Sequence, residues 1–422
     1  MASSSPPAPD VPRGKRASLG AIFLTVFLDI LGFSLVLPFL AAEARAMFGT
    51  SELTGTLLGS VYSLMQFLFV PVWGRLSDRI GRRPVLVWSV FAATLAMLGL
   101  GLSLTFAGSV AWLFAMRIAA GIATANLGTA SAYIADVTKP EDRAKGMGLI
   151  GVAFGLGFIL GPAMGGLLAE YTVNGRQGPV PCFVAVGLGL VNLVWVVFGL
   201  PESLPPSLRN KSTRPLSPLD LEAARTTFAD RGVATAIVVN FIVLIGFTSL
   251  DQTFRFFTQD RFGLSARQTG LVLGLVGIVA AITQGGILRP LASRYREATL
   301  IRGGTLIQAV AFGGLAVSPS LGVPALLGFS ALLALGNGLT QPSIAGYISR
   351  RAAANAQGAT LGTSQSIASL SRMFGPAWGG FSYEHLGPAA PYGSAAVGMV
   401  LALLASGGLG GPAPQPTSTQ TS

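Results

Sequence analysis

The sequence predicts an all-α polytopic membrane protein with 12 transmembrane helices in two pseudo-symmetric six-helix bundles. Three observations carry this prediction. The chain is 51% hydrophobic and only 11% charged, with a mean hydropathy of +0.63, whereas soluble domains carry about 25% charged residues. Apolar runs of about 20 residues, long enough to cross a bilayer as helices, recur along it. The segment GPAMGG at 161–166 returns as GPAWGG at 375–380.

The repeat indicates that the chain is two copies of one unit. Its two occurrences are 214 residues apart, from 161 to 375, and at the same offset Tyr133 falls on Tyr347 and Gly148 on Gly362. This period is far too long for a solenoid. In so apolar a chain it is typical of the parallel duplication found in the halves of transporters.

Twelve runs are predicted to span the membrane, six in each half. Their expected ranges are 18–40, 54–74, 84–106, 109–134, 145–169 and 180–200, then 232–253, 269–289, 298–318, 322–348, 357–381 and 388–410. The expected organisation is a disordered cytoplasmic tail (1–17), a six-helix bundle (18–200), a cytoplasmic linker (201–231), a second bundle (232–410) and a disordered cytoplasmic tail (411–422).

The first tail is Ser/Pro-rich, which does not support an independent fold. A signal peptide is the alternative, but the apolar run 19–40 exceeds the 7–15 residues of a typical signal-peptide core. In the linker, Ser217 and Pro218 followed by acidic residues form a helix-start pattern, so a short surface helix is expected there.

Charge placement predicts the orientation. The loops on one side hold 21 Lys and Arg residues and those on the other hold five. By the positive-inside rule both termini face the cytoplasm, in the inner membrane. This asymmetry also accounts for the net charge of +11 without nucleic acid. One Cys and one His exclude a disulfide framework and a Cys/His metal cluster supplied by this chain alone.

The string GRLSDRIGRR at 74–83 is the most specific motif. It resembles the loop signature G-x-L-x-D-R-x-G-R-R between helices two and three of the major facilitator superfamily. With LDILGFSLVLP at 28–38 and AYIADVTKPEDRAKG at 132–146, it resembles the bacterial tetracycline-efflux branch of the drug:proton antiporters. The resemblance implies a gating loop made of Gly74, Asp78, Arg79, Gly81, Arg82 and Arg83.

Glycines at 74 and 81 would permit a tight turn and close approach, and Asp78 would cap a helix or pair with Arg82 or Arg83. Such a charge cluster would hold one of two packings of the halves. A basic loop that only sets topology is the alternative. In the second half the counterpart is degraded, with Ser293 at the position of Asp78.

Asp29 is the one acid well inside the first predicted helix. A charge there costs several kcal/mol and therefore calls for a function or a partner. It is a candidate proton carrier, and a neutral, hydrogen-bonded Asp or a tie between helices is the alternative. The resemblance implies that the Asp of this LD motif is needed for transport.

Arg117 in the fourth helix matches the family's Arg motif, which the resemblance associates with proton coupling. Snorkelling toward the nearer membrane surface is the alternative. No acid adjoins it in sequence, and Asp29 is its expected partner by elimination.

The segment GFILGPAMGG combines small residues, which let helices approach, with a proline that permits bending. Packing alone would explain it, whereas the resemblance implies an antiporter motif and favours export. Its residues are Gly157, Gly161, Pro162, Gly165 and Gly166. The second copy is preceded by Arg372, for which a tie to backbone carbonyls is favoured over a substrate contact.

Amides within the spans are candidates for lining a substrate cavity, although each could equally join two helices. The candidates are Gln66, Asn126, Asn240, Gln284 and Gln341. Asp251 is expected near the outer end of the seventh helix, in contact with water.

These features predict a monomeric secondary transporter that needs no cofactor beyond the proton gradient and exports a small hydrophobic or drug-like molecule, in the manner of tetracycline efflux. Proton-driven uptake, or carriage of a lipid or metabolite, is the alternative. The hypothesis that the chain is an enzyme has little support, because no nucleophile or metal motif is present. A receptor is a further alternative, and it would show no flux of substrate across a membrane. Helices three and nine lack the Asp that tetracycline pumps carry in each, which places tetracycline itself in doubt.

Overall fold

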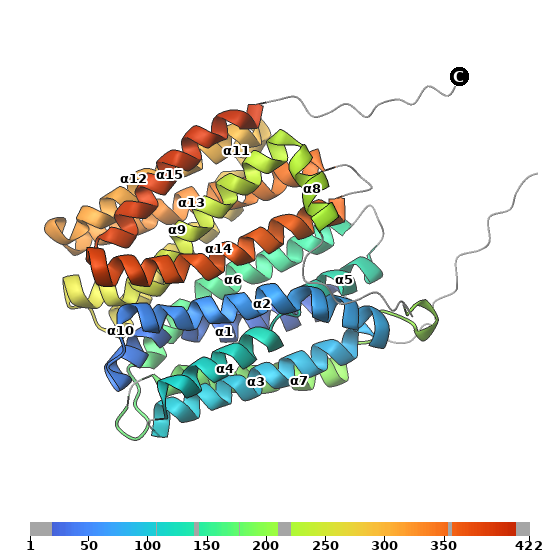
Figure 1. Ribbon diagram of the computed structural model, residues 1–422, viewed down its shortest axis with the longest axis horizontal. Coiled ribbons are helices and arrows are strands. Elements are labelled where there is room, and N and C mark those ends of the chain that lie inside the picture. Colours follow the sequence, from blue (N-terminus) through green and yellow to red (C-terminus); the bar gives the residue numbers. More distant parts are fainter. Residues whose placement is uncertain are drawn as a thin grey trace, which may run out of the picture.

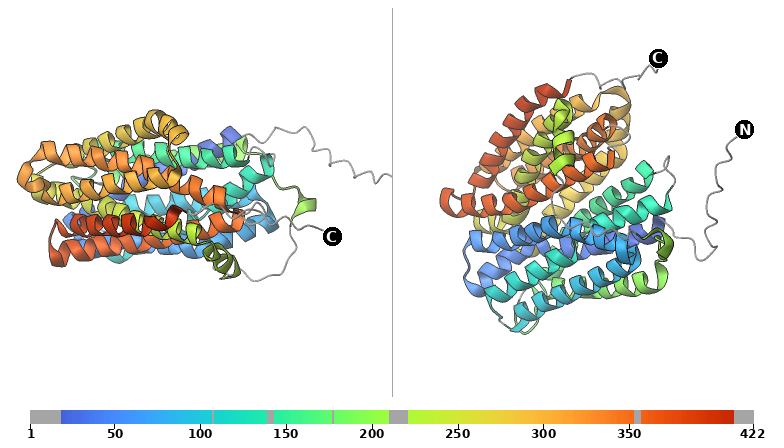
Figure 2. Two further views of the ribbon diagram at one scale, coloured as in Figure 1. Left: turned by 90° about the horizontal axis from the view of Figure 1, so that it is seen from above. Right: turned by 45° about the vertical axis from the view of Figure 1, so that its right-hand side comes forward.

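A computed structural model describes residues 19–106, 108–138, 143–176, 178–209, 221–352 and 357–410. Within these ranges the chain is almost entirely helical and forms two bundles that lie side by side (Figures 1 and 2). The expected tails 1–17 and 411–422 lie outside the described residues.

The first bundle contains the helices α1 (Leu19–Phe48), α2 (Glu52–Ile80), α3 (Arg82–Phe106), α4 (Val110–Ala123), α5 (Leu127–Val137), α6 (Arg143–Ala169) and α7 (Pro179–Gly199). Two short helices follow, η2 (Pro206–Leu208) and α8 (Leu221–Ala229). The second of them is the surface helix expected in the linker.

The second bundle contains α9 (Arg231–Phe262), α10 (Ala266–Ile282), the π-helical turn η3 (Thr283–Ile287), α11 (Leu288–Arg294), α12 (Glu297–Leu321), α13 (Val323–Arg351), α14 (Gln357–Leu386), α15 (Ala390–Ala405) and η4 (Ser406–Gly410). Several helices begin at a side-chain cap. The Oγ atoms of Ser51, Ser109 and Ser265 accept backbone N–H bonds at the starts of α2, α4 and α10, which satisfies donors that have no partner inside the helix.

Eleven helices among the described residues are long and apolar enough to span a membrane. The twelfth expected span corresponds to α14, which is 30 residues long and more polar than the others. It lies in the middle of the molecule, packed between α2 and α9 (Figure 1). Protein surrounds much of this helix, which explains how it accommodates Arg372 and several serines.

The predicted span 109–134 is confirmed, since Val110–Val137 is long and apolar enough to cross a membrane. Within this span the structure breaks the helix between α4 and α5, at Thr124–Asn126. Side chains from other helices satisfy the carbonyls that the break releases. Trp73 Nε1 donates to the carbonyl of Ile122 at 2.6 Å, and Ser89 Oγ donates to that of Ala123 at 2.6 Å. A broken helix is tolerated at membrane depth where its polar groups are satisfied in this way.

The repeated glycine motif packs in the same way in both halves. In α6, the helix positions of Gly157, Gly161 and Gly165 face α1, and Gly166 meets Gly270 of α10 in the other bundle. In α14, Gly375 and Gly379 face α9, and Gly380 meets α2 in the other bundle. Each copy therefore joins its helix to one neighbour in its own half and one across the interface.

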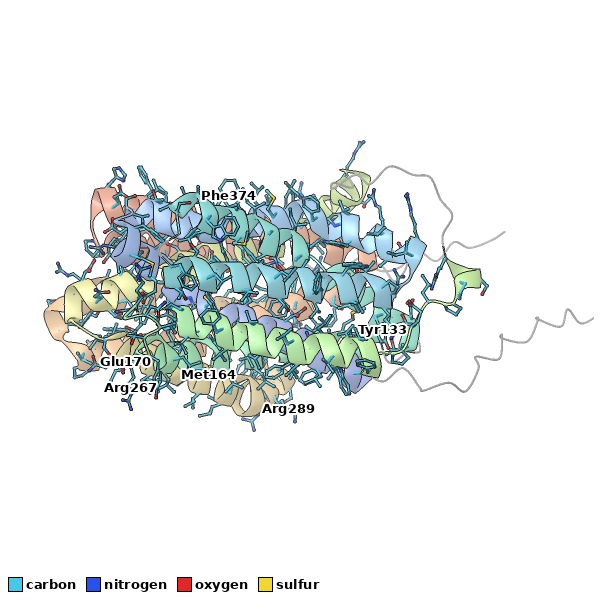
Figure 3. All side chains as sticks on the ribbon, turned by 90° about the horizontal axis from the view of Figure 1, so that it is seen from below. Tyr133, Met164, Glu170, Arg267, Arg289 and Phe374 are labelled. Carbon is cyan, nitrogen blue, oxygen red and sulfur yellow. The ribbon has the colours of Figure 1, made fainter. Side chains whose placement is uncertain are left out.

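We call the end that carries the α2–α3 turn and residues 201–209 the linker end, and the opposite end the far end. Tyr133, whose hydroxyl donates to the carbonyl of Pro201, lies at the linker end, and Glu170 and Arg267 lie at the far end (Figure 3). The far part of α1 packs into the core of the second bundle, where Phe39 joins Phe254 and Phe257.

Candidate functional site

Asp29 is the eleventh residue of α1 and is held by two amides of its own bundle. Asn126 Nδ2, at the α4–α5 break, donates to Oδ2 at 3.0 Å, and Asn192 Nδ2, on α7, donates to Oδ1 at 2.8 Å. Asn126 Nδ2 also donates to Ser89 Oγ at 2.6 Å, and Asn192 Nδ2 to the carbonyl of Thr25 at 3.1 Å. Donors from two other segments, the α4–α5 break and α7, therefore fix the position of this carboxyl group.

Arg117 lies on α4 with a fully buried side chain. Its guanidinium carbon is 4.3 Å from the ring centroid of Tyr62 and 5.5 Å from that of Phe33, and these two rings stack on each other. Nε donates to the carbonyl of Leu58 at 3.2 Å, whereas Nη1 and Nη2 have no hydrogen-bond partner. Cation–π contact is worth more when the cation is removed from water, as this one is. Snorkelling, the alternative considered for Arg117, is therefore excluded in this conformation.

The expected ion pair between Asp29 and Arg117 is absent among the residues that the structure describes. The packing of the helices places the aromatic rings of Phe33 (α1) and Tyr62 (α2) around the guanidinium, where a carboxylate was expected. Tyr62 contacts Arg117 through its ring and bonds through its hydroxyl to the segment that holds Asp29. Its hydroxyl is 2.6 Å from Thr124 Oγ1, two residues before the Asn126 that holds Asp29.

The α4–α5 break is therefore the common support of both groups. Thr124 and Asn126 are two of its three residues, and they bind Tyr62 and Asp29 respectively. Gln66 Nε2 joins the same network by donating to the hydroxyl of Tyr62 at 3.0 Å. Gln66 Nε2 also donates to Thr124 Oγ1 at 3.2 Å, so both Gln66 and Asn126 form hydrogen bonds between helices.

The other amide candidates lie apart from this network. Asn240 is buried in α9 and its Oδ1 has no partner, Gln341 Nε2 in α13 is buried without a partner, and Gln284 is exposed on the π-helical turn η3. Asn192 was missed by the sequence reasoning. As the single amide in the apolar α7, it carried the same signal as the candidates that were chosen.

Two ionisable groups of the second bundle also lie inside their helices. Asp251 is not near a helix end as expected, because α9 continues to Phe262, and its Oδ2 accepts from Gln252 Nε2 at 3.1 Å. The side chain of Gln252 in turn lies against Gly59 of α2. Arg372 Nη2 donates to Ser369 Oγ at 3.0 Å, so its bond goes to a side chain and not to the backbone carbonyl that was favoured.

The motif at 74–83 is helical almost throughout, since α2 continues to Ile80 and α3 begins at Arg82. Gly81 alone turns, with φ +109°, a conformation that glycine adopts without steric cost. The expectation of close approach at Gly74 is wrong, because this residue lies inside α2 with open space beside it.

The charges of this motif pair within the first bundle. Asp78 pairs with Arg82, whose Nε also donates to Asp136 Oδ2 at 3.2 Å. Glu202 accepts from the backbone N–H groups of Arg82 and Arg83 at 2.9 and 3.3 Å. The pairs of Arg82 with Asp78 and Asp136 therefore lie within the first bundle.

At the far end, by contrast, charged groups join the two bundles. Arg45 of α1 donates to Asp260 of α9 at 2.9 Å and also pairs with Glu52 at 3.3 Å. Glu384 of α14 accepts from the backbone N–H of Leu53, in the first turn of α2, at 3.0 Å. The two bundles are therefore tied together at the far end.

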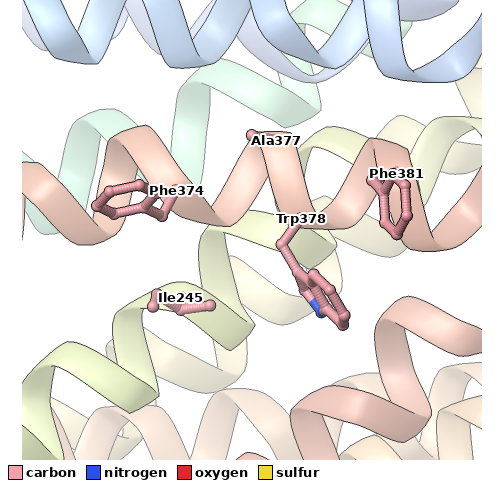
Figure 4. Close-up of a pocket in the computed structure, with 5 residues that line it drawn as sticks. All are labelled: Ile245, Phe374, Ala377, Trp378 and Phe381. Carbon is pink, nitrogen blue, oxygen red and sulfur yellow. The ribbon is translucent and has the colours of Figure 1, made fainter.

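A separate groove of about 460 Å³ runs along α9 and α14 and is lined by Ile245, Phe374, Ala377, Trp378 and Phe381 (Figure 4). Its lining is almost wholly apolar and contains none of the candidate site residues. Phe374, Trp378 and Phe381 are exposed side chains, as expected of a surface in contact with lipid.

Comparison with known proteins gives a consistent answer. Residues 22–376 match the Major Facilitator Superfamily model. The chain is 34% identical to the class C tetracycline resistance protein of Escherichia coli, over 85% of this chain and 88% of that protein. It is 31% identical to major facilitator superfamily domain-containing protein 10 of Bos taurus, over 85% of each. The crystal structure of the human organic anion transporter MFSD10 superposes with a TM-score of 0.68 at 26% identity, covering 94% of this chain and 100% of that one.

The family match spans both bundles, and the fold, the repeated glycine packing and the helix-two signature agree with it. This is a family of membrane transporters and not of enzymes. The chain therefore belongs to the major facilitator superfamily and is a relative of the tetracycline resistance proteins.

Proposed function

We propose that this chain is a proton-coupled antiporter that exports a small hydrophobic or drug-like molecule across the cytoplasmic membrane. The observation that carries the proposal is the carboxyl group of Asp29, placed within the first bundle and held by two amide donors. Amides can hold both the ionised and the protonated form of a carboxyl group, because each amide offers a donor and an acceptor. An arginine partner would instead hold the carboxylate ionised.

Arg117 contributes a charge that does not titrate in the physiological range. The ring of Tyr62 packs against Arg117, and the Tyr62 hydroxyl bonds to the same helix break that holds Asp29. A change of protonation at Asp29 would therefore act on a connected set of side chains from α1, α2, α4 and α7. Coupling follows if the two conformations of the carrier bind the proton with different affinity.

The arrangement of the bundles fits an inward-facing state. The ties between bundles lie at the far end, and the positive-inside rule places the linker end in the cytoplasm. In the cycle that we propose, Asp29 gains a proton from outside, the carrier turns inward, and substrate binding accompanies loss of the proton to the cytoplasm. The inward-directed proton gradient then drives export.

The acidic residue content of α3 and α12 bears on the nature of the substrate. The relatives include tetracycline resistance proteins, but α3 has no acid and α12 has only Glu297, in its first turn. A site for a drug chelated to a divalent cation is thus poorly provided, and we propose a hydrophobic compound without a bound metal.

The proposal is tested by the susceptibility of cells that express the wild type or Asp29→Asn to a panel of antibiotics and dyes. We expect the wild type to protect against at least one compound and Asp29→Asn to abolish that protection. Everted vesicles should show loss of the pH gradient when this compound is added to the wild type alone.

Two matched variants control for folding and for loss of charge. Asp29→Glu keeps a titratable group and should retain part of the protection, whereas Asp251→Asn removes an acid from the other bundle and should leave the coupling in place. Equal protection by the wild type and Asp29→Asn would remove Asp29 from the mechanism. A pH change of the opposite sign would indicate uptake.

A further inference from the structure

A second pocket, of about 480 Å³, lies at the linker end between α3, α7 and the start of the linker. Arg83 and Arg209 supply its cations, Glu202 lies between them, and Trp88 and Val197 form its apolar wall. Neither the transport cycle nor the gating motif accounts for this combination, because the pocket opens on the outer surface of the first bundle.

The charges of the pocket are unequal. The Glu202 carboxylate accepts from the backbone N–H groups of Arg82, Arg83 and Leu204 at 2.9–3.3 Å, so the start of α3 already binds it. Arg209 pairs with it at 3.8 Å. The Nε atoms of both Arg83 and Arg209 have no hydrogen-bond partner. The Arg83 guanidinium donates from Nη2 to the carbonyl of Val197. Two guanidinium groups and one carboxylate therefore line the pocket and leave one positive charge, which an anion of one negative charge would balance.

An exposed apolar face continues from the pocket along the same two helices. Trp88 has 62% of its surface exposed, and Phe91 and Leu95 follow it on α3. On α7, Phe198 is 74% exposed and Val194 58%. These helices pack side by side, so the face is continuous (Figure 1).

The pocket also lies at the depth where lipid headgroups are found. Arg83 is the second residue of α3, a helix of 25 residues, which at a rise of about 1.5 Å per residue spans the hydrocarbon core. Tryptophan is enriched at such boundaries, and basic pockets between transmembrane helices bind anionic headgroups.

We propose that this pocket binds an anionic phospholipid of the cytoplasmic leaflet, with its phosphate between Arg83 and Arg209 and an acyl chain along the α3–α7 face. The bound lipid would hold the start of the linker against the turn that contains Gly81. The side chain of Glu202 already occupies the space that a Cβ at Gly81 would need. This inference depends on the predicted orientation but not on proton exchange at Asp29.

The test is native mass spectrometry of the full chain in detergent, with dioleoylphosphatidylglycerol or dioleoylphosphatidylcholine added. The wild type should bind the anionic lipid more tightly. Arg209→Gln should lower that affinity about fivefold, the effect of one basic residue near a membrane surface. Arg294→Gln removes an exposed cation from α11 at the same end, away from the pocket, and should change little.

Two further variants sharpen the result. Glu202→Gln leaves both cations without their acidic neighbour and should bind the anionic lipid at least as tightly as the wild type. If Arg209→Gln does not fold, Trp88→Ala replaces it and should weaken binding of both lipids while both cations remain.

Equal losses for Arg209→Gln and Arg294→Gln would overturn the proposal, because only general charge attraction would then be at work. Unchanged binding by Arg209→Gln, or by Trp88→Ala where that variant takes its place, would do the same. Full displacement of the lipid by a millimolar excess of inorganic phosphate would also contradict it, since the pocket would then be a site for free phosphate.

Discussion

The contact between Gly166 and Gly270 offers a direct test of how the far end closes. A Cβ built at Gly166 would lie 2.4 Å from Gly270 Cα and 2.8 Å from the carbonyl oxygen of Ala266, whereas ordinary contacts are 3.4–4 Å. These atoms are backbone and cannot rotate away. Gly166→Ala therefore requires α6 and α10 to move apart by about 1 Å where the bundles meet.

The size of the effect follows from packing. Forcing one extra carbon into a tight contact typically costs about 1–3 kcal/mol. The gain in helix propensity of Ala over Gly applies to both conformations and cancels between them. The ratio of far-end-closed to far-end-open carriers should thus fall about 5- to 150-fold.

Spin labels at Ala111 and Ser320 would report this ratio by double electron–electron resonance, since both positions are exposed at the far end, one in each bundle. The native Cys182 is buried and need not be removed. The control is Gly151→Ala, which lies on the same helix with no atom within 4 Å of the new Cβ. Identical distance distributions for Gly166→Ala and Gly151→Ala would refute the reasoning.

Three further predictions concern individual groups. Asn192→Leu removes a donor that favours the ionised form of Asp29. The midpoint of the pH dependence of transport should therefore move upward, as measured in proteoliposomes buffered at a series of pH values. An unmoved midpoint would show that this amide is only structural. Arg117→Lys keeps the charge but loses the planar contact with Tyr62. Transport should therefore slow about tenfold in a protein with unchanged thermal stability. Full activity would show that Arg117 serves only to balance charge. Arg45→Gln removes partly exposed ion pairs worth about 0.2–1 kcal/mol each, so the same resonance measurement should show only a few-fold loss of the closed form, and complete opening would contradict this estimate.

The fold could be predicted because its signals are local. Each apolar run predicts one helix by its own length and composition. The segments GPAMGG and GPAWGG indicate the duplication without knowledge of any contact. The structure adds that Gly166 and Gly380 both pack against the opposite bundle. The polar α14 was found as well, since the repeat fixed its place.

The interior of the site could be predicted only in part, because its bonds join helices distant in sequence. Asp29 and Arg117 stand out as charges within apolar runs, but which side chains surround them depends on helix order in space. The α4–α5 break has no local cause in Gly or Pro. It is stabilised by Trp73 and Ser89 from other helices, so the apolar run that predicted the span contained no sign of the break.

The central claim is that the carboxyl group of Asp29 exchanges a proton for the substrate. It is tested most directly by the proton release of the purified carrier in unbuffered detergent, when a compound found in the susceptibility panel is added. We expect the wild type and Asp251→Asn to release protons on binding, and Asp29→Asn to bind the compound without release. Equal release by Asp29→Asn and the wild type would contradict the account.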